Sequence, residues 1–370
     1  MKGDSLDIFL DLVRIDSPTR RESQVCAWCA AALAELGFTV EIDDSASVTG
    51  SDTGNLIATL PGVECDATLI LSAHLDCVDP CTGVIPVVED GIVRSEGSTV
   101  LGADDKAGIT AILVAAARAV RQTGQRPNLK VVLTTAEESG LAGAKALPPH
   151  AFDGDVCLVL DAAGDPGSIV VGAPTHHTFA ARFVGVASHA GIAPEKGRSA
   201  LEMAAQAVSV MQLGRIDEHT TANIGTIEGG TATNVVPALA TVTGECRSLV
   251  RTRAEEVRAA MDRAMREAAE AFGGIVEIEW SLEYDGFVVA DDSAELKLVS
   301  DACRDAGFTP TTFMTGGGSD GNIFAAAGVP TFVLGCGMQD AHSIDEHIAI
   351  KDIDGVAEIV SAVIARMAKG

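Results

Sequence analysis

Residues 130–143 read KVVLTTAEESGLAG, and the fold prediction starts from this stretch. An apolar run at 131–133 is followed by Thr134 and Thr135, and then by two adjacent acids, Glu137 and Glu138. Short, wholly apolar runs between helical segments are typical of strands in a mostly parallel sheet that is covered on both faces. The stretch therefore predicts a buried strand at 129–135 with two carboxylates at its carboxyl end.

Similar apolar runs occur near both ends of the chain and alternate with segments of helical periodicity. Strands that alternate with helices in this way predict an α/β fold, with a mostly parallel sheet and helices on both faces. The other predicted strands are 38–42, 55–60, 68–73, 156–160 and 330–334, and the predicted helices are 6–14, 22–36, 105–120, 294–306 and 352–367.

The pattern changes between about residues 175 and 288. Here half-exposed strands alternate with two helices in the order β-α-β-β-α-β, which is the split arrangement of an antiparallel sheet with both helices on one face. We therefore expect two domains. One α/β domain is formed by residues 1–174 and 289–370, and an inserted α+β domain is formed by residues 175–288.

Composition excludes several classes of protein. The chain has 370 residues, of which 47% are apolar, and a formal net charge of -26. Such a field repels phosphate backbones, so we expect no nucleic-acid partner. No apolar segment is long enough for a membrane span or a signal peptide, which predicts a cytoplasmic protein with no membrane partner. Nine cysteines without framework spacing predict reduced thiols, and Cys26 and Cys29 lie inside a predicted helix, as core thiols do.

Acids and imidazoles follow the predicted strands at the edge where sites form in such sheets. Each alone has a plain structural explanation, such as a helix cap or a solvated turn. Together, however, their carboxylates would repel one another strongly unless divalent cations compensated the charge. The residues are His74, Asp76, Asp104, Glu137, Glu138, Asp161 and His342. Two imidazoles with three carboxylates suit zinc or a similar ion, and a shared carboxylate would make a co-catalytic pair.

Eight motifs in a fixed order resemble the co-catalytic zinc exopeptidases that include carboxypeptidase G, aminoacylase and peptidase T. They span residues 72–347 and read SAHLD, LGADDKAG, TTAEESGLAG, LVLDA, SHAGIAPEKGRSAL, GGTATNVVP, GGGSDGN and AHSIDEH. The second and third of these resemble the peptidase T branch most. The resemblance implies a zinc-exopeptidase-like catalytic domain interrupted by a lid and dimerisation domain.

The resemblance also implies a role for each residue at the sheet edge. His74, Asp104 and Asp161 would hold one metal, and Asp104 would bridge to a second held by Glu138 and His342. Glu137 would be the general base, and Asp76 would fix the ring of His74. The peptide bond between Asp104 and Asp105 is often cis in the family.

In the inserted domain the resemblance implies substrate binding and a homodimer. His189 would reach the partner subunit's site and polarise the scissile carbonyl, although by itself it could be a strand-end histidine. Arg247 could equally form an ordinary ion pair. The implied substrate-binding residues are His189, Asn234, Arg247, Gly317, Gly318 and Ser319.

The resulting functional prediction is hydrolysis of the amide bond next to a free terminus of a short peptide, as in a tripeptide aminopeptidase. It requires two divalent metal ions, zinc foremost, with manganese or cobalt as alternatives. A dipeptidase, a carboxypeptidase and an N-acyl amino acid deacylase stay open, as does a non-catalytic peptide-binding protein. Cys77, beside the metal-type residues, is either a packing residue or an adventitious ligand.

Overall fold

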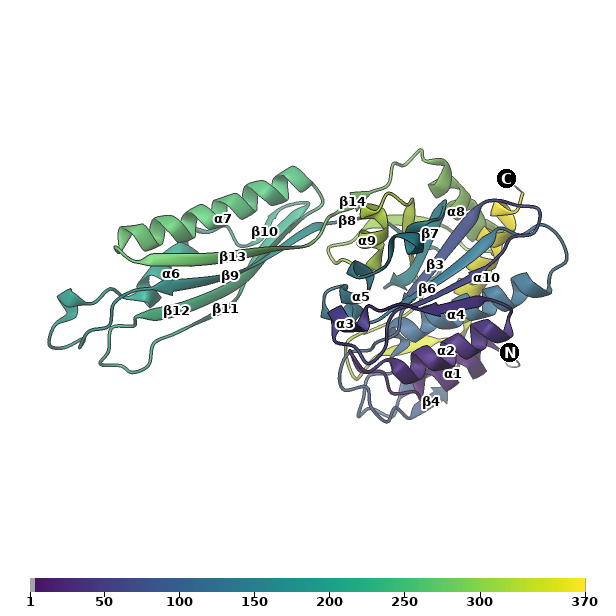
Figure 1. Ribbon diagram of the computed structural model, residues 1–370, viewed down its shortest axis with the longest axis horizontal. Helices are drawn as coiled ribbons and strands as arrows, with labels where there is room; N and C mark the ends of the chain where they lie inside the picture. The colour runs from purple at the N-terminus through teal and green to yellow at the C-terminus, as the bar shows by residue number, and fades with distance from the viewer. Residues whose placement is uncertain (1–3, 370) are drawn as a thin grey trace. The chain divides into compact units, whose positions relative to one another are not determined.

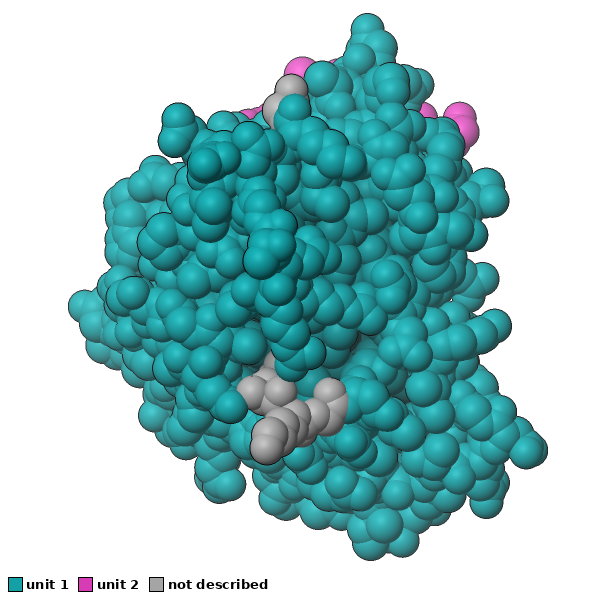
Figure 2. Space-filling model, turned by 90° about the vertical axis from the view of Figure 1, so that its right-hand side faces the viewer, with its two compact units in different colours: residues 1–171, 289–314, 319–370 teal, residues 172–288, 315–318 magenta. Residues whose placement is uncertain are grey.

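The computed structural model describes residues 4–369, which divide into two compact units. Unit 1 comprises residues up to 171 together with 289–314 and those from 319 onward, and unit 2 comprises residues 172–288 and 315–318. Figure 1 shows the elements of both units, and Figure 2 shows one face of unit 1 in teal. The predicted inserted domain is residues 175–288. Unit 2 begins three residues earlier, at residue 172, and also includes the short segment 315–318.

A nine-stranded sheet organises unit 1, although β14 and the last two residues of β8 fall within residues 172–288. Its strands run in the order β1-β2-β6-β3-β7-β16-β8-β14, and β15 pairs with β8. The four central strands, β6, β3, β7 and β16, are parallel, whereas the outer pairs are antiparallel. The bounds are β1 Thr39–Ile42, β2 Leu56–Leu60, β3 Thr68–His74, β6 Asn128–Thr134, β7 Val156–Ala162, β8 Ser168–Ala173, β14 Phe287–Val288, β15 Thr311–Met314 and β16 Thr331–Gly335.

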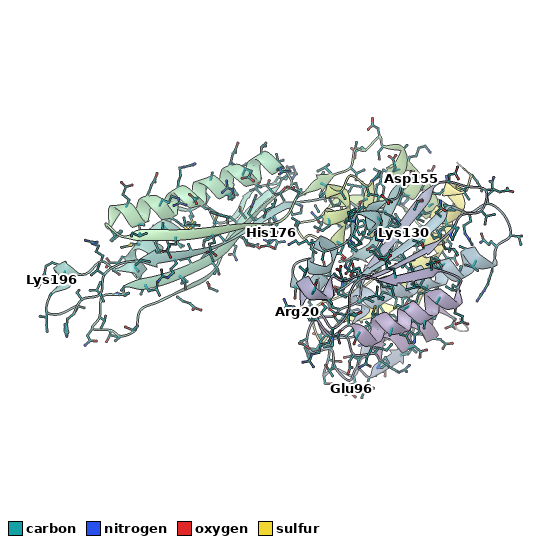
Figure 3. The ribbon with its side chains drawn as sticks, viewed as in Figure 1. Arg20, Glu96, Lys130, Asp155, His176 and Lys196 are labelled. Atoms are coloured by element: carbon teal, nitrogen blue, oxygen red, sulfur yellow. The ribbon has the colours of Figure 1, made fainter. Side chains whose placement is uncertain are left out.

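The register of the central strands brings their carboxyl ends to one edge. His74 is the Cα partner of Thr134, and Gly335 is the partner of Ala162. Nearly every residue of these strands is buried, which explains their apolar sequences. Lys130 on β6, labelled in Figure 3, is buried too but is an exception to the apolar composition. Its ammonium donates to the backbone oxygens of His150 and Asp153.

Helices flank this sheet. The long helix α4 packs on β3 and β7 and against α1 and α10, while α9 packs on β7 and β16. Leu71, Ile109, Leu158, Phe332 and Val360 are fully buried in the resulting core. The helices of unit 1 are α1 Ser5–Val13, α2 Ser23–Glu35, α3 Ala46–Thr49, α4 Ala103–Arg121, α5 Ala142–Lys145, α8 Ala294–Asp305, α9 Asp320–Ala326 and α10 Ile350–Met367, with 3-10 turns η1 Glu137–Ser139 and η2 Pro149–Phe152.

Unit 2 has its own antiparallel sheet, with strand order β10-β11-β12-β9-β13. Helices α6 and α7 pack together and on this sheet, burying Phe183, Met203, Val242, Met261 and Met265. The elements are β9 Thr175–Val184, η3 Pro194–Lys196, α6 Ala200–Val210, β10 Gly214–Asp217, β11 Thr220–Gly229, β12 Leu239–Ser248, α7 Arg251–Ala271 and β13 Ile275–Tyr284. The short strand β10 is additional to the predicted β-α-β-β-α-β order.

Several short strands of unit 1 were not predicted from the sequence. Three of them form a small separate sheet, in the order β17-β5-β4, and their bounds are β4 Pro86–Glu89, β5 Ile92–Ser95 and β17 His347–Ala349. Within residues 4–369, none of the helices is both long enough and apolar enough to span a membrane.

Candidate metal centre

The metal-type residues come from five segments of unit 1. His74 ends β3, Glu137 and Glu138 lie in the turn directly after β6, and Asp161 lies near the end of β7. Asp104 lies in the first turn of α4, next to a cis peptide bond to Asp105, as the family resemblance implied. His342 follows β16 in a loop, where its backbone is in the left-handed region, with φ 64°.

The structure brings these side chains together. The Nε2 atom of His74 lies 3.0 Å from Asp104 Oδ1 and 3.7 Å from Asp161 Oδ1. The Nε2 atom of His342 lies 3.2 Å from Asp104 Oδ2 and 2.8 Å from Glu138 Oε1. The two oxygens of Asp104 therefore face different imidazoles, one from each side of the cluster.

These residues form overlapping groups of potential metal ligands. Three sets have ligand atoms within 4.8 Å of one another, and they are His74 with Asp104 and Asp161, Asp104 with Glu138 and His342, and His74 with Glu137 and Glu138. The first two sets share Asp104. Imidazole nitrogens and carboxylate oxygens in sets of three fit a pair of divalent ions that share one carboxylate.

The electrostatics of the cluster show carboxylates crowded in a buried place. Burial raises the pKa of Asp161 to about 7. Burial also raises the pKa of Glu137 well above its ordinary value, and the charge of Asp161 adds to this effect. Hydrogen bonds to Asp104 and Glu138 raise the pKa of His342 to about 10. These shifts show that the cluster needs compensating positive charge, because carboxylates this close to one another cannot all be ionised alone.

Asp76 contacts both the ring of His74 and the turn that carries the two glutamates. The ring Nδ1 of His74 hydrogen-bonds to the backbone oxygen of Asp76 at 2.9 Å, while the carboxylate Oδ1 lies farther away, at 3.5 Å. The carboxylate instead accepts hydrogen bonds from the backbone N–H groups of Glu137 (2.9 Å) and Glu138 (3.2 Å) and from the hydroxyl of Thr19 (2.8 Å). Asp76 therefore fixes His74 mainly through its main chain and holds the glutamate turn through its side chain.

Three further buried acids around the cluster were not predicted as site residues. Glu346 accepts hydrogen bonds from the backbone N–H groups of Gly102 (2.6 Å) and Asp104 (2.9 Å). Asp105 accepts from the N–H of His74 at 3.2 Å. Asp320 accepts from the Thr134 hydroxyl, and burial raises its pKa to about 6.

The sequence feature that could have identified these three acids is their position next to the metal-type residues or the Gly-rich run. Asp105 adjoins Asp104, Asp320 follows the Gly-rich run at 316–318, and Glu346 lies four residues after His342 in the last motif. The partners of Glu346 and Asp105 are backbone amides, which no residue pattern specifies.

Cys77 is a packing residue in this structure. It is buried with Cys81 and Val100, and burial raises the pKa of its thiol. None of the potential ligand groups among the described residues includes it. Cys26 and Cys29 are likewise buried in the core, as predicted.

The residues proposed for substrate binding belong to unit 2, except Ser319. His189 and Val235 form an isolated β-bridge, and the backbone oxygen of Asn234 accepts from the N–H of Ala190 at 2.9 Å, so the SHAG and TNVVP segments lie side by side. The ring Nδ1 of His189 accepts from the N–H of Gly191 at 3.2 Å. His189 and Asn234 are thus neighbours within unit 2.

Arg247 forms the ion pair that the sequence left open. Its guanidinium donates to both oxygens of Glu245, at 3.2 and 2.9 Å, and to the hydroxyl of Tyr284 at 3.3 Å. Glu245 also pairs with His176, which Figure 3 labels, at 2.8 Å. Gly316 contributes a backbone oxygen 3.3 Å from Arg247 Nη1.

The Gly-rich run has structural roles in addition to any contact with substrate. A Cβ on Gly318 would lie 2.2 Å from the ring of Tyr284, so only glycine fits there. A Cβ on Gly317 would meet little, the nearest atom being Thr315 Oγ1 at 3.7 Å. Ser319 caps α9, because its hydroxyl accepts from the N–H of Gly321 at 3.2 Å.

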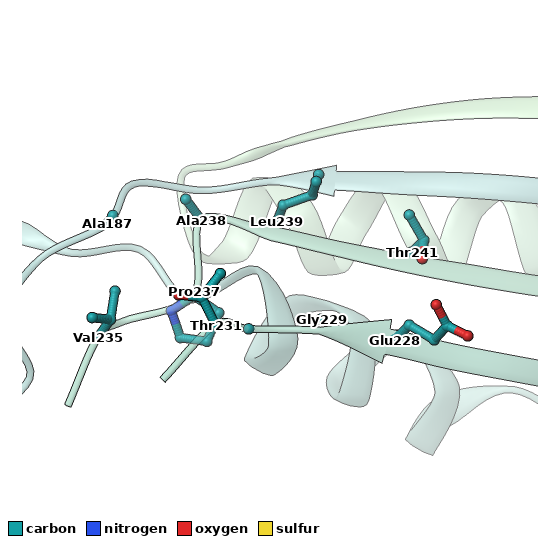
Figure 4. Close-up of a pocket in the computed structure, with 10 residues that line it drawn as sticks. Ala187, Glu228, Gly229, Thr231, Val235, Pro237, Ala238, Leu239 and Thr241 are labelled. Atoms are coloured by element: carbon teal, nitrogen blue, oxygen red, sulfur yellow. The ribbon is translucent and has the colours of Figure 1, made fainter. Parts of the chain in front are cut away.

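A cavity of about 450 Å³ also lies in unit 2, and Figure 4 shows its lining. The lining residues are Ala187, Glu228, Gly229, Gly230, Thr231, Val235, Pro237, Ala238, Leu239 and Thr241. Only one of them, Glu228, is ionisable, so this cavity lacks the groups for metal-dependent chemistry.

Residues 70–366 match the family described as Peptidase family M20/M25/M40. The chain belongs to this peptidase family. The match begins just before His74 and ends beyond His342, so it contains all the metal-type residues of the cluster. This M20 peptidase is therefore a metallopeptidase by family, and the resemblance inferred from its motifs is confirmed.

Several relatives match this M20 peptidase over nearly its whole length. It is 40% identical to the uncharacterized protein YqjE of Bacillus subtilis (strain 168), over 98% of both chains. The crystal structure of aminopeptidase PepT from Bacillus cereus ATCC 10987 has 39% identity and a TM-score of 0.93, over 98% of both chains. The structure of a tripeptidase from Staphylococcus aureus subsp. aureus Mu50 has 36% identity and a TM-score of 0.95, over 99% of this chain and 98% of that one. These matches confirm the predicted α/β fold with its inserted domain.

Proposed function

We propose that this chain is a tripeptide aminopeptidase, which releases the N-terminal residue of a short peptide with the help of two divalent metal ions. The observation that carries the proposal is the carboxylate of Asp104, which lies between His74 and His342 with one oxygen toward each. The substrate class follows from the similarity to aminopeptidase PepT and to the staphylococcal tripeptidase over nearly the whole chain.

In this proposal His74, Asp104 and Asp161 hold one ion, and Asp104, Glu138 and His342 hold the other. Zinc is the first choice because imidazole and carboxylate ligands suit it, and manganese and cobalt also accept this set. Bound divalent ions supply a water of lowered pKa and a Lewis acid for the amide carbonyl.

Glu137 is the general base in this proposal. Its carboxylate lies with the ligands, in one group with His74 and Glu138, and burial raises its pKa well above the ordinary value, which favours acceptance of a proton. Glu137 takes a proton from the attacking water and then gives it to the leaving nitrogen. Its backbone is held by Asp76 while this happens.

The inserted domain contributes substrate binding and dimerisation in this proposal. His189 from a second copy of the chain polarises the scissile carbonyl, and Asn234 and Arg247 bind the polar ends of the peptide. Gly317, Gly318 and Ser319 supply backbone and hydroxyl contacts. Arg247 already pairs with Glu245, so it would act as a hydrogen-bond donor within a neutral pair rather than as a free positive charge. The proposed location is the cytoplasm.

A panel of short substrates tests the proposal. The metal-loaded protein is incubated with a tripeptide, the same tripeptide acetylated at its N-terminus, a dipeptide and an N-acyl amino acid, each with and without chelator. We expect release of the N-terminal residue from the free tripeptide only, with loss of activity on chelation. The variant Glu137→Gln is the matched control, because it should keep the metals.

The same panel distinguishes the alternatives. Cleavage of the acylated substrates alone would identify a deacylase, and cleavage at the other end of the tripeptide a carboxypeptidase. A dipeptidase would cleave the dipeptide alone. Inactivity on all substrates, in the presence of bound zinc, cobalt or manganese, would favour a peptide-binding protein.

A further inference from the structure

Residues 15–22, here called the N-terminal strap, contact the candidate metal centre although they precede the family match at 70–366. The backbone oxygen of Ile15 accepts from the buried ammonium of Lys106 at 2.8 Å. The backbone oxygen of Ser17 accepts from the N–H of Cys77 at 2.9 Å. The strap therefore runs beside the segments that carry Asp76 and Asp104.

Glu22 links the strap to the turn that precedes the two glutamates. Its side chain is fully buried, and its Oε1 atom accepts from two backbone N–H groups, those of Arg20 at 2.6 Å and Ala136 at 3.1 Å. Arg20, labelled in Figure 3, has φ 74° and Ala136 has φ 51°. Both residues are thus in the left-handed region, which costs free energy for a residue other than glycine. One carboxylate oxygen holds both.

Ala136 directly precedes Glu137, so its conformation sets the direction in which the two glutamates leave β6. The strap supports this turn a second time through Thr19, whose hydroxyl donates to Asp76 Oδ2 at 2.8 Å. Asp76 in turn accepts from the N–H groups of Glu137 and Glu138. Two strap side chains therefore act on one turn, Glu22 directly and Thr19 through Asp76.

Helix capping does not explain Glu22. It occupies the N-cap position of α2, but its side chain makes no capping hydrogen bond. Its second oxygen, Oε2, is buried and has no hydrogen-bond partner within residues 4–369. A buried, half-satisfied carboxylate near the charge of Asp76 is costly to stability. A local packing role would be filled better by an apolar residue.

We propose that Glu22 and Thr19 are positioning residues for the general base, holding the turn at 136–138 so that Glu137 and Glu138 point in their separate directions. This inference rests on the proposed function for its effect on turnover. Its structural part, the restraint of the turn, does not depend on that function.

Four variants test the inference. Glu22→Leu removes the acceptor, Glu22→Gln keeps an oxygen that can accept both bonds, and Thr19→Val removes the hydroxyl at nearly constant shape. Ser23→Ala is the control, since the Ser23 hydroxyl donates to the exposed carboxylate of Asp52, at 2.7 Å. For each variant kcat and KM on a tripeptide, bound metal, thermal stability and hydrogen exchange of peptides covering 134–141 are measured.

We expect Glu22→Leu to lower kcat by about 10- to 100-fold, as small misplacements of catalytic groups do, with KM and metal content little changed. Thr19→Val should show a smaller loss of the same kind. Glu22→Gln and Ser23→Ala should resemble the wild type. Exchange at 136–138 should speed up in Glu22→Leu and Thr19→Val alone.

Two results would overturn the inference. One is unchanged exchange at 136–138 in Glu22→Leu, and the other is a loss of kcat matched by an equal loss of folded, metal-loaded protein. If the wild type itself cleaves no peptide, the proposed function fails, and the exchange measurement still decides whether the strap restrains the turn.

Discussion

Removing the carboxylate of Asp76 should loosen the glutamate turn by an amount that can be worked out from its hydrogen bonds. In Asp76→Ala the N–H groups of Glu137 and Glu138 lose their acceptor, while the Thr19 hydroxyl can rotate to another partner. A buried unsatisfied donor costs about 1–3 kcal/mol. Because both glutamates are only partly buried, we expect about 1–2 kcal/mol for each, or about 2–4 kcal/mol in total. Asp76→Asn keeps one acceptor oxygen and should lose roughly half of this.

Thermal unfolding with the metals removed measures this effect without the ligands. At about 2–4 °C per kcal/mol for a domain of this size, Asp76→Ala should lower Tm by roughly 4–16 °C, and Asp76→Asn by about half as much. Asp52→Ala is the matched control, because Asp52 also accepts from a backbone N–H and a hydroxyl, both of Ser23, at the exposed surface. The reasoning is refuted if Asp76→Ala unfolds at the wild-type temperature, or if Asp52→Ala loses as much.

Three other predictions concern the base, the ligands and unit 2. Glu137→Gln should lower kcat on a tripeptide by about 10²- to 10⁴-fold while mass spectrometry finds the metal content unchanged; bound metal with full turnover would contradict its role. His342→Ala should bind one ion per chain instead of two, and titration with a chromophoric chelator checks the stoichiometry; two retained ions would remove it from the ligand set. Glu245→Gln should destabilise unit 2, because the hydrogen bond from His176, together with the guanidinium of Arg247, lowers the pKa of Glu245 from 4.5 to about 2 despite partial burial. A carboxylate with a lowered pKa stabilises the folded state above pH 4.5, and this stabilisation is lost as the pH falls toward 2. The difference in Tm between Glu245→Gln and the wild type should therefore be present at pH 7 and disappear in acid. Allowing for solvent screening, the stabilisation is about 1–2 kcal/mol.

The parallel core of unit 1 could be predicted because burial on both faces leaves its mark on sequence. The strands β3, β6, β7 and β16 are apolar runs, and each coincides with a predicted strand within a few residues. The strand β8 was missed, and nothing in its sequence tells that it runs antiparallel to β16. The short strands at 86–95 were missed because they are half exposed and carry little apolar pattern.

The candidate ligands could be named from sequence because chemistry restricts them to a few residue types at strand ends. What sequence could not show is how they are held. The N–H groups of Gly102 and Asp104 donate to Glu346, more than 240 residues away, and a backbone donor has no residue type to recognise.

The strand pair β8–β14 has a consequence for protein engineering. The chain enters unit 2 within β8, at Gly172, and leaves it at the end of β14. These two strands pair antiparallel, with Ala173 opposite Phe287 and Gly172 opposite Val288. The segments at which the chain enters and leaves unit 2 are therefore paired like the two strands of a β-hairpin. A two-residue type I′ turn spans such a pair. The geometry thus allows residues 174–286 to be exchanged for Asn-Gly, or for an unrelated domain with adjacent termini, without altering the register of either strand.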